Sequence, residues 1–461
     1  MLQRYIGDKA FYRRVLGIAF PLVIQNAITS FVSLLDNVMI GQVGTLQMSG
    51  VSIVNQLMFI FNLCIFGATA GAGIFTAQFY GLGDEKNIRY TVRFKVMTCT
   101  LLSFAWCGAL LMADTGLIGM YLQGEGSAAD AAATLNYGRE YLHMIVWGLL
   151  PFALCNAYAS TLRETGQTVV PMVGSIAALF TNLALNYVLI FGHFGAPAMG
   201  VKGAALATVI ARFVELAVVA GWAHLHTHRH TFIRGLYRSF YLPVRLLTAI
   251  IRKATPLIIN ESLFATGLAL VNQSYSTCGL EVVPALNICS TIAQIAGVAY
   301  FATGNTTGII LGQMMGAGQS EERIRDSSRK LILLSVASGV LFGGLIAALS
   351  GVFPTLYNTT DQVRAIATQL ILINALMLPS NSYVHASYFA LRSGGKTMIT
   401  FLFDSGFMWG VYVPCAFLLS RFTALPIVPL YFICQSVEYI KAVVGWLMLK
   451  KCNWIQNLTK K

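Results

Sequence analysis

The stretch AFPLVIQNAI, residues 19–28, indicates an internal repeat, because a similar stretch, ATPLIINESL, occurs at residues 254–263. The match places Pro21 opposite Pro256. Both stretches are apolar, and each contains one proline, which weakens the backbone hydrogen-bond ladder of a helix. We therefore expect each stretch to lie in a long helix and predict that Pro21 and Pro256 act as hinges.

Two further pairs of segments repeat in the same order. AQFYGLGDE at 77–85 resembles GQMMGAGQS at 312–320, and LRETGQT at 162–168 resembles LRSGGKT at 391–397. Ordered self-similarity of this kind is the signature of an internal repeat. The sequence therefore predicts two copies of one structural unit.

The composition indicates a polytopic membrane protein. Hydrophobic residues make up 56% of the 461 residues, charged residues make up 11%, and the mean hydropathy is +0.67, which excludes an ordinary soluble domain. A bilayer core about 30 Å thick requires about 20 apolar residues per helix. The twelve predicted spans are 15–40, 51–80, 96–113, 137–161, 169–191, 201–223, 254–277, 286–314, 331–350, 365–390, 398–419 and 426–449.

The twelve spans divide into two sets of six. Because six is even, both sets enter the membrane in the same orientation, so we predict two parallel six-helix repeats around a central cleft, in an all-α fold. Rocking of the two repeats would open that cleft to each side of the membrane in turn. The predicted domains are an N-terminal bundle at 1–222, a basic cytoplasmic linker at 223–253, and a C-terminal bundle with a short cytoplasmic tail at 254–461.

The net charge of +13 raises the question of a nucleic-acid partner. Most of the 31 Lys and Arg residues, however, fall on one side of a twelve-helix arrangement. The positive-inside rule assigns that side, with both termini, to the cytoplasm of a cell inner membrane. We therefore expect a lipid bilayer and no nucleic acid as partner, no cleavable signal peptide, and a monomer.

The nine cysteines include no C-x-x-C pair, so we expect no metal, cofactor or redox chemistry. Cys278 and Cys289 flank a predicted outer loop and are the one pair considered for a disulfide, although unpaired thiols are expected. Four of the seven histidines lie in HLHTHRH at 224–230. Zinc binding or pH sensing is an alternative there, but no Cys or acidic ligand accompanies the histidines, which favours a solvated basic loop.

Several motifs together resemble the multidrug and toxic compound extrusion (MATE) transporters. They are FPLVIQ and SLLDNVMIG in the first helix, the turn from Gly81 to Asp84, LRETGQT, and the run LIFGHFGAPAMGVKGAALATVIAR from Leu189 to Arg212. The resemblance covers essentially the whole chain. It implies export of small organic compounds, often cationic or amphipathic, driven by inward movement of H⁺ or Na⁺.

Asp36 is the first acidic residue within a predicted span. Ionisable groups within a bilayer are costly and usually mark a pathway. A low-dielectric environment favours the protonated form of a carboxyl, so Asp36 is a candidate carrier of the coupling ion, with a structural Asp as the alternative. By resemblance, the family's partner positions fall on Asn182 and Asn186. Family members with an acidic pair often carry Asp at the second position, and Asn186 departs from that pattern.

Glu261 is the corresponding candidate in the second repeat. By resemblance it matches the family's cation-binding glutamate, and the family's acidic position on the tenth helix falls near Asn381. One carboxylate with amide or backbone oxygens suits sodium as well as a proton, because hard cations take several oxygen ligands. The alternative is a structural Glu261 bonded to helix-end amides.

The sequence spacing of the remaining intramembrane charged residues predicts which of them form ion pairs. Arg212 with Glu215, and Glu438 with Lys441, lie three residues apart and are predicted to pair structurally on one helix face. Asp404 is predicted either to contact substrate or to cap a packing cluster. Tyr300 and Phe301 are predicted to bind substrate, since large apolar side chains suit a promiscuous cleft, and Asn156 completes the predicted substrate-binding set.

The sequence therefore predicts a secondary antiporter and no enzyme, because it contains no nucleotide loop, ordered nucleophile or metal constellation. A lipid-linked oligosaccharide flippase of the same broad superfamily is the first alternative, which would favour extra helices and a strongly cationic cleft. A channel or receptor is the second, which electrical recording would distinguish.

Overall fold

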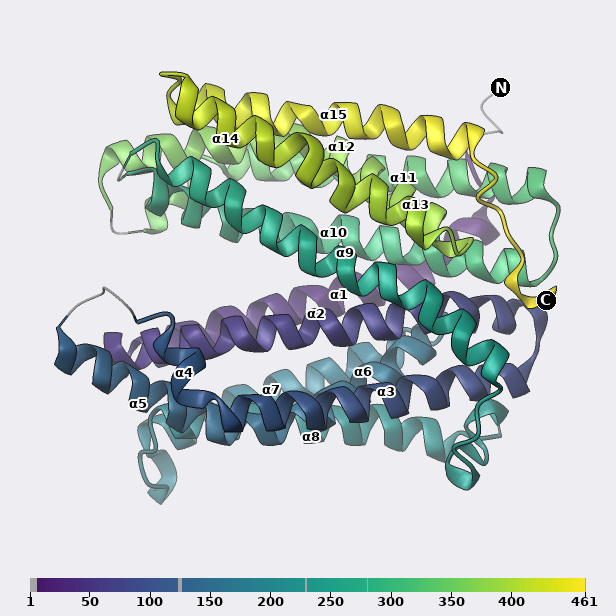
Figure 1. Cartoon of the computed structure of the whole chain (residues 1–461), viewed down its shortest axis with the longest axis horizontal. Coiled ribbons are helices and arrows are strands. Elements are labelled where there is room, and N and C mark those ends of the chain that lie inside the picture. The colour runs from purple at the N-terminus through teal and green to yellow at the C-terminus, as the bar shows by residue number, and fades with distance from the viewer. Residues whose placement is uncertain (1–5, 123–126, 229, 280, 358, 461) are drawn as a thin grey trace. The chain divides into compact units, whose positions relative to one another are not determined.

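A computed structural model of the chain describes residues 6–122, 127–228, 230–279, 281–357 and 359–460. Within these residues the fold is all-α, and twelve helical segments are long and apolar enough to cross a membrane (Figure 1). The predicted fold class and number of spans are confirmed.

The helices of the first half run from Lys9 to Leu225. They are α1 (Lys9–Gly41), α2 (Thr45–Leu82), α3 (Glu85–Met112), the short α4 (Asp114–Gly119), α5 (Ala128–Ile145), α6 (Leu149–Glu164), α7 (Val169–Phe191) and α8 (Val201–Leu225). A short 3₁₀ turn joins α5 to α6, so the two helices make one span, Ala129–Glu164.

The helices of the second half repeat this plan. They are α9 (Val244–Ser276), α10 (Val282–Gly316), α11 (Glu321–Leu349), α12 (Asp361–Ser393), α13 (Thr397–Phe401), α14 (Val413–Phe422) and α15 (Ile427–Lys451). Two π-helical stretches, Leu402–Gly406 and Met408–Tyr412, lie between α13 and α14 and complete one span. Such stretches are rare and occur frequently at functional sites.

Contacts divide the chain into two compact units. The N-terminal unit comprises residues 24–76 and 84–254, and the C-terminal unit comprises residues 255–461 together with 77–83 and the N-terminal stretch up to Val23. The division therefore passes through α1, α2 and α9. The predicted boundaries of 1–222, 223–253 and 254–461 describe the sequence repeat and stay a prediction.

The repeated glycine motifs form the same structure in both copies. Gly83 has a φ of +79° and ends α2, and Gly318 has a φ of +68° and ends α10. This left-handed backbone favours glycine, which has no Cβ. Asp84 then caps α3 by accepting a hydrogen bond from the backbone N–H of Asn87.

The same motifs cross one another inside the C-terminal unit. A Cβ on Gly81 would overlap the carbonyl oxygen of Gln313, and a Cβ on Gly316 would overlap that of Gln78. The fully buried Gln78 side chain also donates to the Ser393 carbonyl at 3.0 Å. The two repeated segments thus require glycine for close packing of backbone on backbone.

Part of the predicted linker at 223–253 packs against α3. After α8, the side chains of Phe232, Ile233 and Leu236 are buried, and Arg93 of α3 donates to the Leu236 carbonyl at 2.8 Å. These contacts hold residues 232–236 against α3, whereas His224 and His228 of the histidine segment at 224–230 are exposed, so the solvated loop expected there stays a prediction.

The histidines of this segment make packing contacts. His224 lies within α8, 2.8 Å from the Tyr158 hydroxyl, and His230 is buried. No group of three or more potential metal ligands occurs among the described residues. Cys278 and Cys289 are free thiols.

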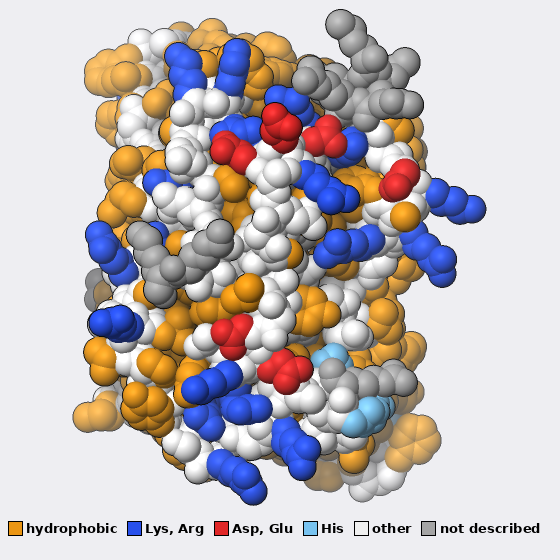
Figure 2. Space-filling view, turned by 90° about the vertical axis from the view of Figure 1, so that its right-hand side faces the viewer, with side chains coloured by type: hydrophobic (Ala, Val, Ile, Leu, Met, Phe, Trp, Pro, Cys, Tyr) orange, Lys and Arg blue, Asp and Glu red, His pale blue; other side chains and the backbone are white. Residues whose placement is uncertain are grey.

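The helices expose apolar side chains along their length and charged side chains at their ends, as expected of helices that cross a bilayer. Large apolar side chains such as Leu101, Phe104 and Phe180 are more than half exposed, which a lipid environment would cover. Figure 2 looks onto the helix ends nearest the two termini and shows many Lys and Arg side chains there, with fewer Asp and Glu.

Candidate functional site

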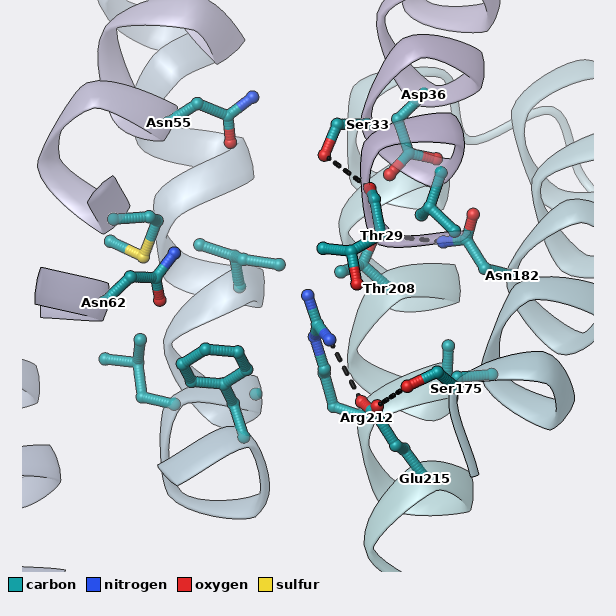
Figure 3. A pocket seen from close by; sticks show the side chains of 18 of the residues that line it. Thr29, Ser33, Asp36, Asn55, Asn62, Ser175, Asn182, Thr208, Arg212 and Glu215 are labelled. Carbon is teal, nitrogen blue, oxygen red and sulfur yellow. Dashed lines mark hydrogen bonds and ion pairs between the residues drawn. The ribbon is translucent and has the colours of Figure 1, made fainter. Parts of the chain in front are cut away.

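The N-terminal unit contains a cavity of about 360 Å³. Helices α1, α2, α5, α6, α7 and α8 supply its walls, and Figure 3 shows polar side chains from several of them pointing into it. Its apolar lining includes Met58, Phe59, Phe61 and Phe152. Its polar lining residues are Thr29, Ser33, Asp36, Asn55, Asn62, Tyr141, Ser175, Asn182, Thr208, Arg212 and Glu215.

Asp36 of α1 lies on the cavity wall beside two amides of α7. The Asn186 Nδ2 donates to Asp36 Oδ1 at 2.6 Å and to Asn182 Oδ1 at 3.1 Å, and Asn182 Nδ2 donates to Thr208 Oγ1 at 3.2 Å. Asn182 and Asn186 lie four residues apart, which places both on one face of α7. The structure thus brings together the three residues that the resemblance grouped, and their coupling role stays a prediction.

The carboxylate of Asp36 forms no ion pair among the described residues. Beside it, the buried Asn186 Oδ1 has no hydrogen-bond partner in the part of the chain that the structure describes. Buried acceptors are nearly always bonded, so one that is not requires an explanation. An acceptor next to a carboxylate can receive the O–H of that carboxylate once the latter takes up a proton.

Arg212 and Glu215 of α8 form the predicted ion pair, at 3.0 Å between Nη1 and Oε2. The Ser175 hydroxyl donates to Glu215 Oε1 at 2.9 Å, and Gln25 Nε2 of α1 donates to Ser175 Oγ at 3.2 Å. The guanidinium carbon of Arg212 lies 4.8 Å from the centre of the Phe152 ring. Sequence spacing predicted the pair but not its position in the cavity wall.

In the C-terminal unit, Asp404 is neutralised. Lys441 Nζ lies 2.7 Å from Asp404 Oδ1, and the buried Asn260 donates to Asp404 Oδ2 at 3.0 Å. The predicted partner of Lys441 was Glu438, and this prediction is wrong. Asp404 lies on the π-helical stretch Leu402–Gly406, within reach of Lys441 of α15, and the buried Lys441 ammonium requires a close counter-ion.

Glu261 of α9 and Asn381 of α12 lie in the same unit, both half-buried. Neither takes part in an ion pair of the described chain. The structure leaves their predicted role in ion coupling untested.

The predicted substrate-binding residues do not line the cavity of the N-terminal unit. The Asn156 side chain donates to the Phe152 carbonyl one turn earlier in α6, at 3.0 Å. Tyr300 and Phe301 of α10 pack around His385, with ring centres 4.5 and 4.7 Å from the imidazole. Sequence reasoning missed His385, which has no distinctive spacing from either aromatic residue.

The predicted hinges lie close to the division between the two units. Pro21 lies inside α1, which divides after Val23, and Pro256 lies inside α9, which divides after Ala254. Each proline thus occurs near the point where one helix passes from one set of contacts to the other.

The repeated six-helix plan, and a cavity whose half-buried carboxylate makes no ion pair in the described chain, are typical of a membrane transport protein. The family model named MatE matches residues 21–188 and 256–418, one segment in each half. The chain belongs to this family, the multidrug and toxic compound extrusion transporters.

Curated relatives match most of the chain. The probable multidrug resistance protein NorM of Thermotoga maritima is 24% identical over 428 residues, which cover 90% of this chain and 86% of that protein. The probable multidrug resistance protein YoeA of Bacillus subtilis is 26% identical over 417 residues, covering 88% and 86% of the two chains.

Solved structures share the fold. An outward-facing multidrug resistance MATE transporter of the MOP superfamily superposes with a TM-score of 0.87 at 16% identity, covering 100% of this chain and 98% of the other. The Vibrio cholerae MATE transporter VcmN in its bent form gives 0.84 at 18% identity, covering 96% and 97%. At these identities the likeness establishes the two-repeat fold.

Proposed function

We propose that this protein is a secondary antiporter that exports small organic cations and amphipathic compounds in exchange for inward-moving protons, and that Asp36 carries the proton. The observation that supports the proposal most strongly is a carboxylate on a cavity wall, without an ion pair in the described chain, beside the unpartnered oxygen of Asn186.

A proton fits these contacts better than sodium does. A donor, Asn186 Nδ2, lies 2.6 Å from Asp36 Oδ1. A donor pointing at the carboxylate occupies the position that a hard cation with several oxygen ligands would need. A proton needs only one carboxylate oxygen, and its O–H can then donate to a nearby acceptor.

Charge counting explains how exchange would follow. The charged groups that line the cavity are Asp36, Arg212 and Glu215. With Asp36 ionised they sum to one negative charge, and with Asp36 protonated they sum to zero. A cationic substrate therefore binds better to the ionised form, and by linkage a proton binds better to the empty cavity. Substrate and proton thus displace one another.

The prolines offer a route from this exchange to movement. Pro21 and Asp36 lie on the same helix, and the helix divides between two sets of contacts just after Pro21. A relative has been solved in a bent form. Neutralisation of Asp36 would release α1 from its charged contact with α7 and permit a bend at Pro21.

The remaining assignments follow from the basic residues. Their excess on one side of the twelve-helix arrangement supports cytoplasmic termini and an inner-membrane location, by the positive-inside rule.

We further propose that the protein acts as a monomer, because the helices of the N-terminal unit supply the walls of the cavity.

The test uses purified protein in lipid vesicles and a fluorescent cation, rhodamine 123. An imposed pH gradient is expected to drive accumulation, and a sodium gradient of equal size is not. Asp36→Asn should abolish the pH-driven component, whereas Asp130→Asn, at an exposed acid near the start of α5, is the matched control. Sodium-driven accumulation, or full accumulation by Asp36→Asn, would contradict the proposal.

A further inference from the structure

Arg212 gives the cavity a positive pole in addition to the negative pole at Asp36. Figure 3 shows its side chain extending from α8 into the cavity, with Asn62 on the opposite wall. About a third of the Arg212 side chain is exposed, compared with a tenth of that of its partner Glu215. The guanidinium is therefore the accessible member of the pair.

The guanidinium has capacity left for a ligand. It carries five N–H donors in a planar fork, and the described chain gives it one hydrogen bond, from Nη1 to Glu215 Oε2 at 3.0 Å. The guanidinium carbon lies 4.8 Å over the centre of the Phe152 ring, a cation–π contact that holds the fork at the cavity wall. A fixed fork with free edges matches the geometry of a carboxylate better than any other side chain does.

Glu215 is held in a way that does not depend on Arg212 alone. Its Oε1 accepts from Ser175, which in turn accepts from Gln25. The Glu215 carboxylate thus keeps a hydrogen-bonded partner if the guanidinium turns toward a ligand. The Ser175 hydrogen bond keeps one oxygen of the Glu215 carboxylate satisfied while Arg212 shares its donors between Glu215 and a substrate.

We infer that Arg212 is a specificity-determining residue that recognises an anionic group, so that the cavity accepts zwitterionic amphiphiles as well as simple cations. The amine of such a compound would face Asp36, its carboxylate would face Arg212, and its aromatic body would contact Phe59, Phe61 and Phe152. This inference rests on the proposed export function and names a substrate class for the same cavity.

Two dyes provide a matched pair of probes. Rhodamine 123 is the methyl ester of rhodamine 110, so the two dyes share one aromatic body and differ in the free carboxylate. The readout is the ratio of rhodamine 110 to rhodamine 123 taken up by vesicles under a fixed pH gradient. A ratio cancels differences in protein amount and in gradient.

The variant Arg212→Gln with Glu215→Gln removes both charges of the pair and keeps the net charge of the cavity. The rhodamine ratio should fall about tenfold or more, because a hydrogen bond to a charged group is worth about 1.5–3 kcal/mol. Arg212→Lys, which keeps the charge but loses the fork, should lower the ratio by less. The matched control is Asp361→Asn with Arg364→Gln, an ion pair of the same spacing at the start of α12.

Binding in detergent extends the test to variants that no longer transport. Fluorescence anisotropy gives the affinity of each dye, and the ratio of affinities should change as the ratio of rates does. An unchanged ratio in both assays, or wild-type protein that takes up rhodamine 123 and excludes rhodamine 110, would overturn the role of Arg212. Failure of wild-type protein to accumulate either dye would instead overturn the antiport proposal.

Discussion

Two half-buried aspartates, one in each unit, have similar neighbours but differ in whether an ion pair neutralises them. Asp36 and Asp404 each lie on a membrane helix and each accept a hydrogen bond from an asparagine of another helix, Asn186 or Asn260. Lys441 neutralises Asp404 at 2.7 Å, and no ion pair neutralises Asp36 in the described chain. An aspartate that is already paired with a lysine has a structural role, whereas an unpaired carboxylate on a cavity wall can take up an ion.

The largest expected effect comes from removing the counter-ion of Asp404. Lys441→Met should lower the free energy of unfolding by about 3–5 kcal/mol, because it leaves a buried charge unpaired. The double variant Lys441→Met with Asp404→Asn should recover much of that loss. Chemical denaturation in detergent micelles measures both. A single variant as stable as wild type would show that this pair is dispensable and that the contrast with Asp36 is misplaced.

A smaller effect is expected at the amide beside Asp36. Asn186→Ala removes a hydrogen bond to a charged group, worth about 1.5–3 kcal/mol, so the rate of proton-driven uptake should fall about tenfold. Asn156→Ala is the matched control, because that amide bonds only within its own helix in the described structure. Equal effects of the two substitutions would contradict a specific role of the Asn186–Asp36 hydrogen bond in proton-driven uptake.

Sequence patterns predicted the elements of this fold better than they predicted its contacts. Apolar runs of membrane length located all twelve spans, and repeated motifs such as 77–85 and 312–320 predicted turns that both end at a positive-φ glycine. These features depend on local composition. Hydropathy and turn chemistry are properties of a short segment, so a single sequence is enough to predict spans and turns.

The charged contacts depend on partners that are distant in the chain. Spacing found Arg212 with Glu215, but it paired Lys441 with Glu438, although its true partner, Asp404, lies on another helix. Lys95 of α3 is buried against Glu164 of α6, a contact between residues far apart in the sequence. No local pattern shows which of several acids a buried lysine will meet.

The smallest effect is expected outside the membrane helices, at Asp114 of α4. Its Oδ2 lies 2.8 Å from Arg139 Nε and 2.8 Å from His143 Nε2. Burial alone would raise the pKa of Asp114, but hydrogen bonds from Arg139, His143 and Thr115 hold that pKa well below its ordinary value. The carboxylate therefore stays ionised throughout the physiological range.

Asp114→Asn should lower stability by at most about 1 kcal/mol, since both partners are more than a third exposed and solvent screens the interaction. A depressed pKa contributes stability that is present above the ordinary Asp pKa, about 3.9, and is lost as the pH falls below it. The difference between wild type and variant should thus shrink as the pH falls below about 4. A difference that stays unchanged down to about pH 2 would indicate that another group controls this contact.

Substrate and proton are proposed to exclude one another at Asp36. Binding of substrate should therefore release a proton, which can be measured in solution. Rhodamine 123 is added to purified protein in weakly buffered detergent solution near pH 6, and a pH indicator reports the protons released. The account predicts net release by wild type and by Glu261→Gln, and none by Asp36→Asn that still binds the dye. Equal release by Asp36→Asn and wild type, or release lost only in Glu261→Gln, would contradict it.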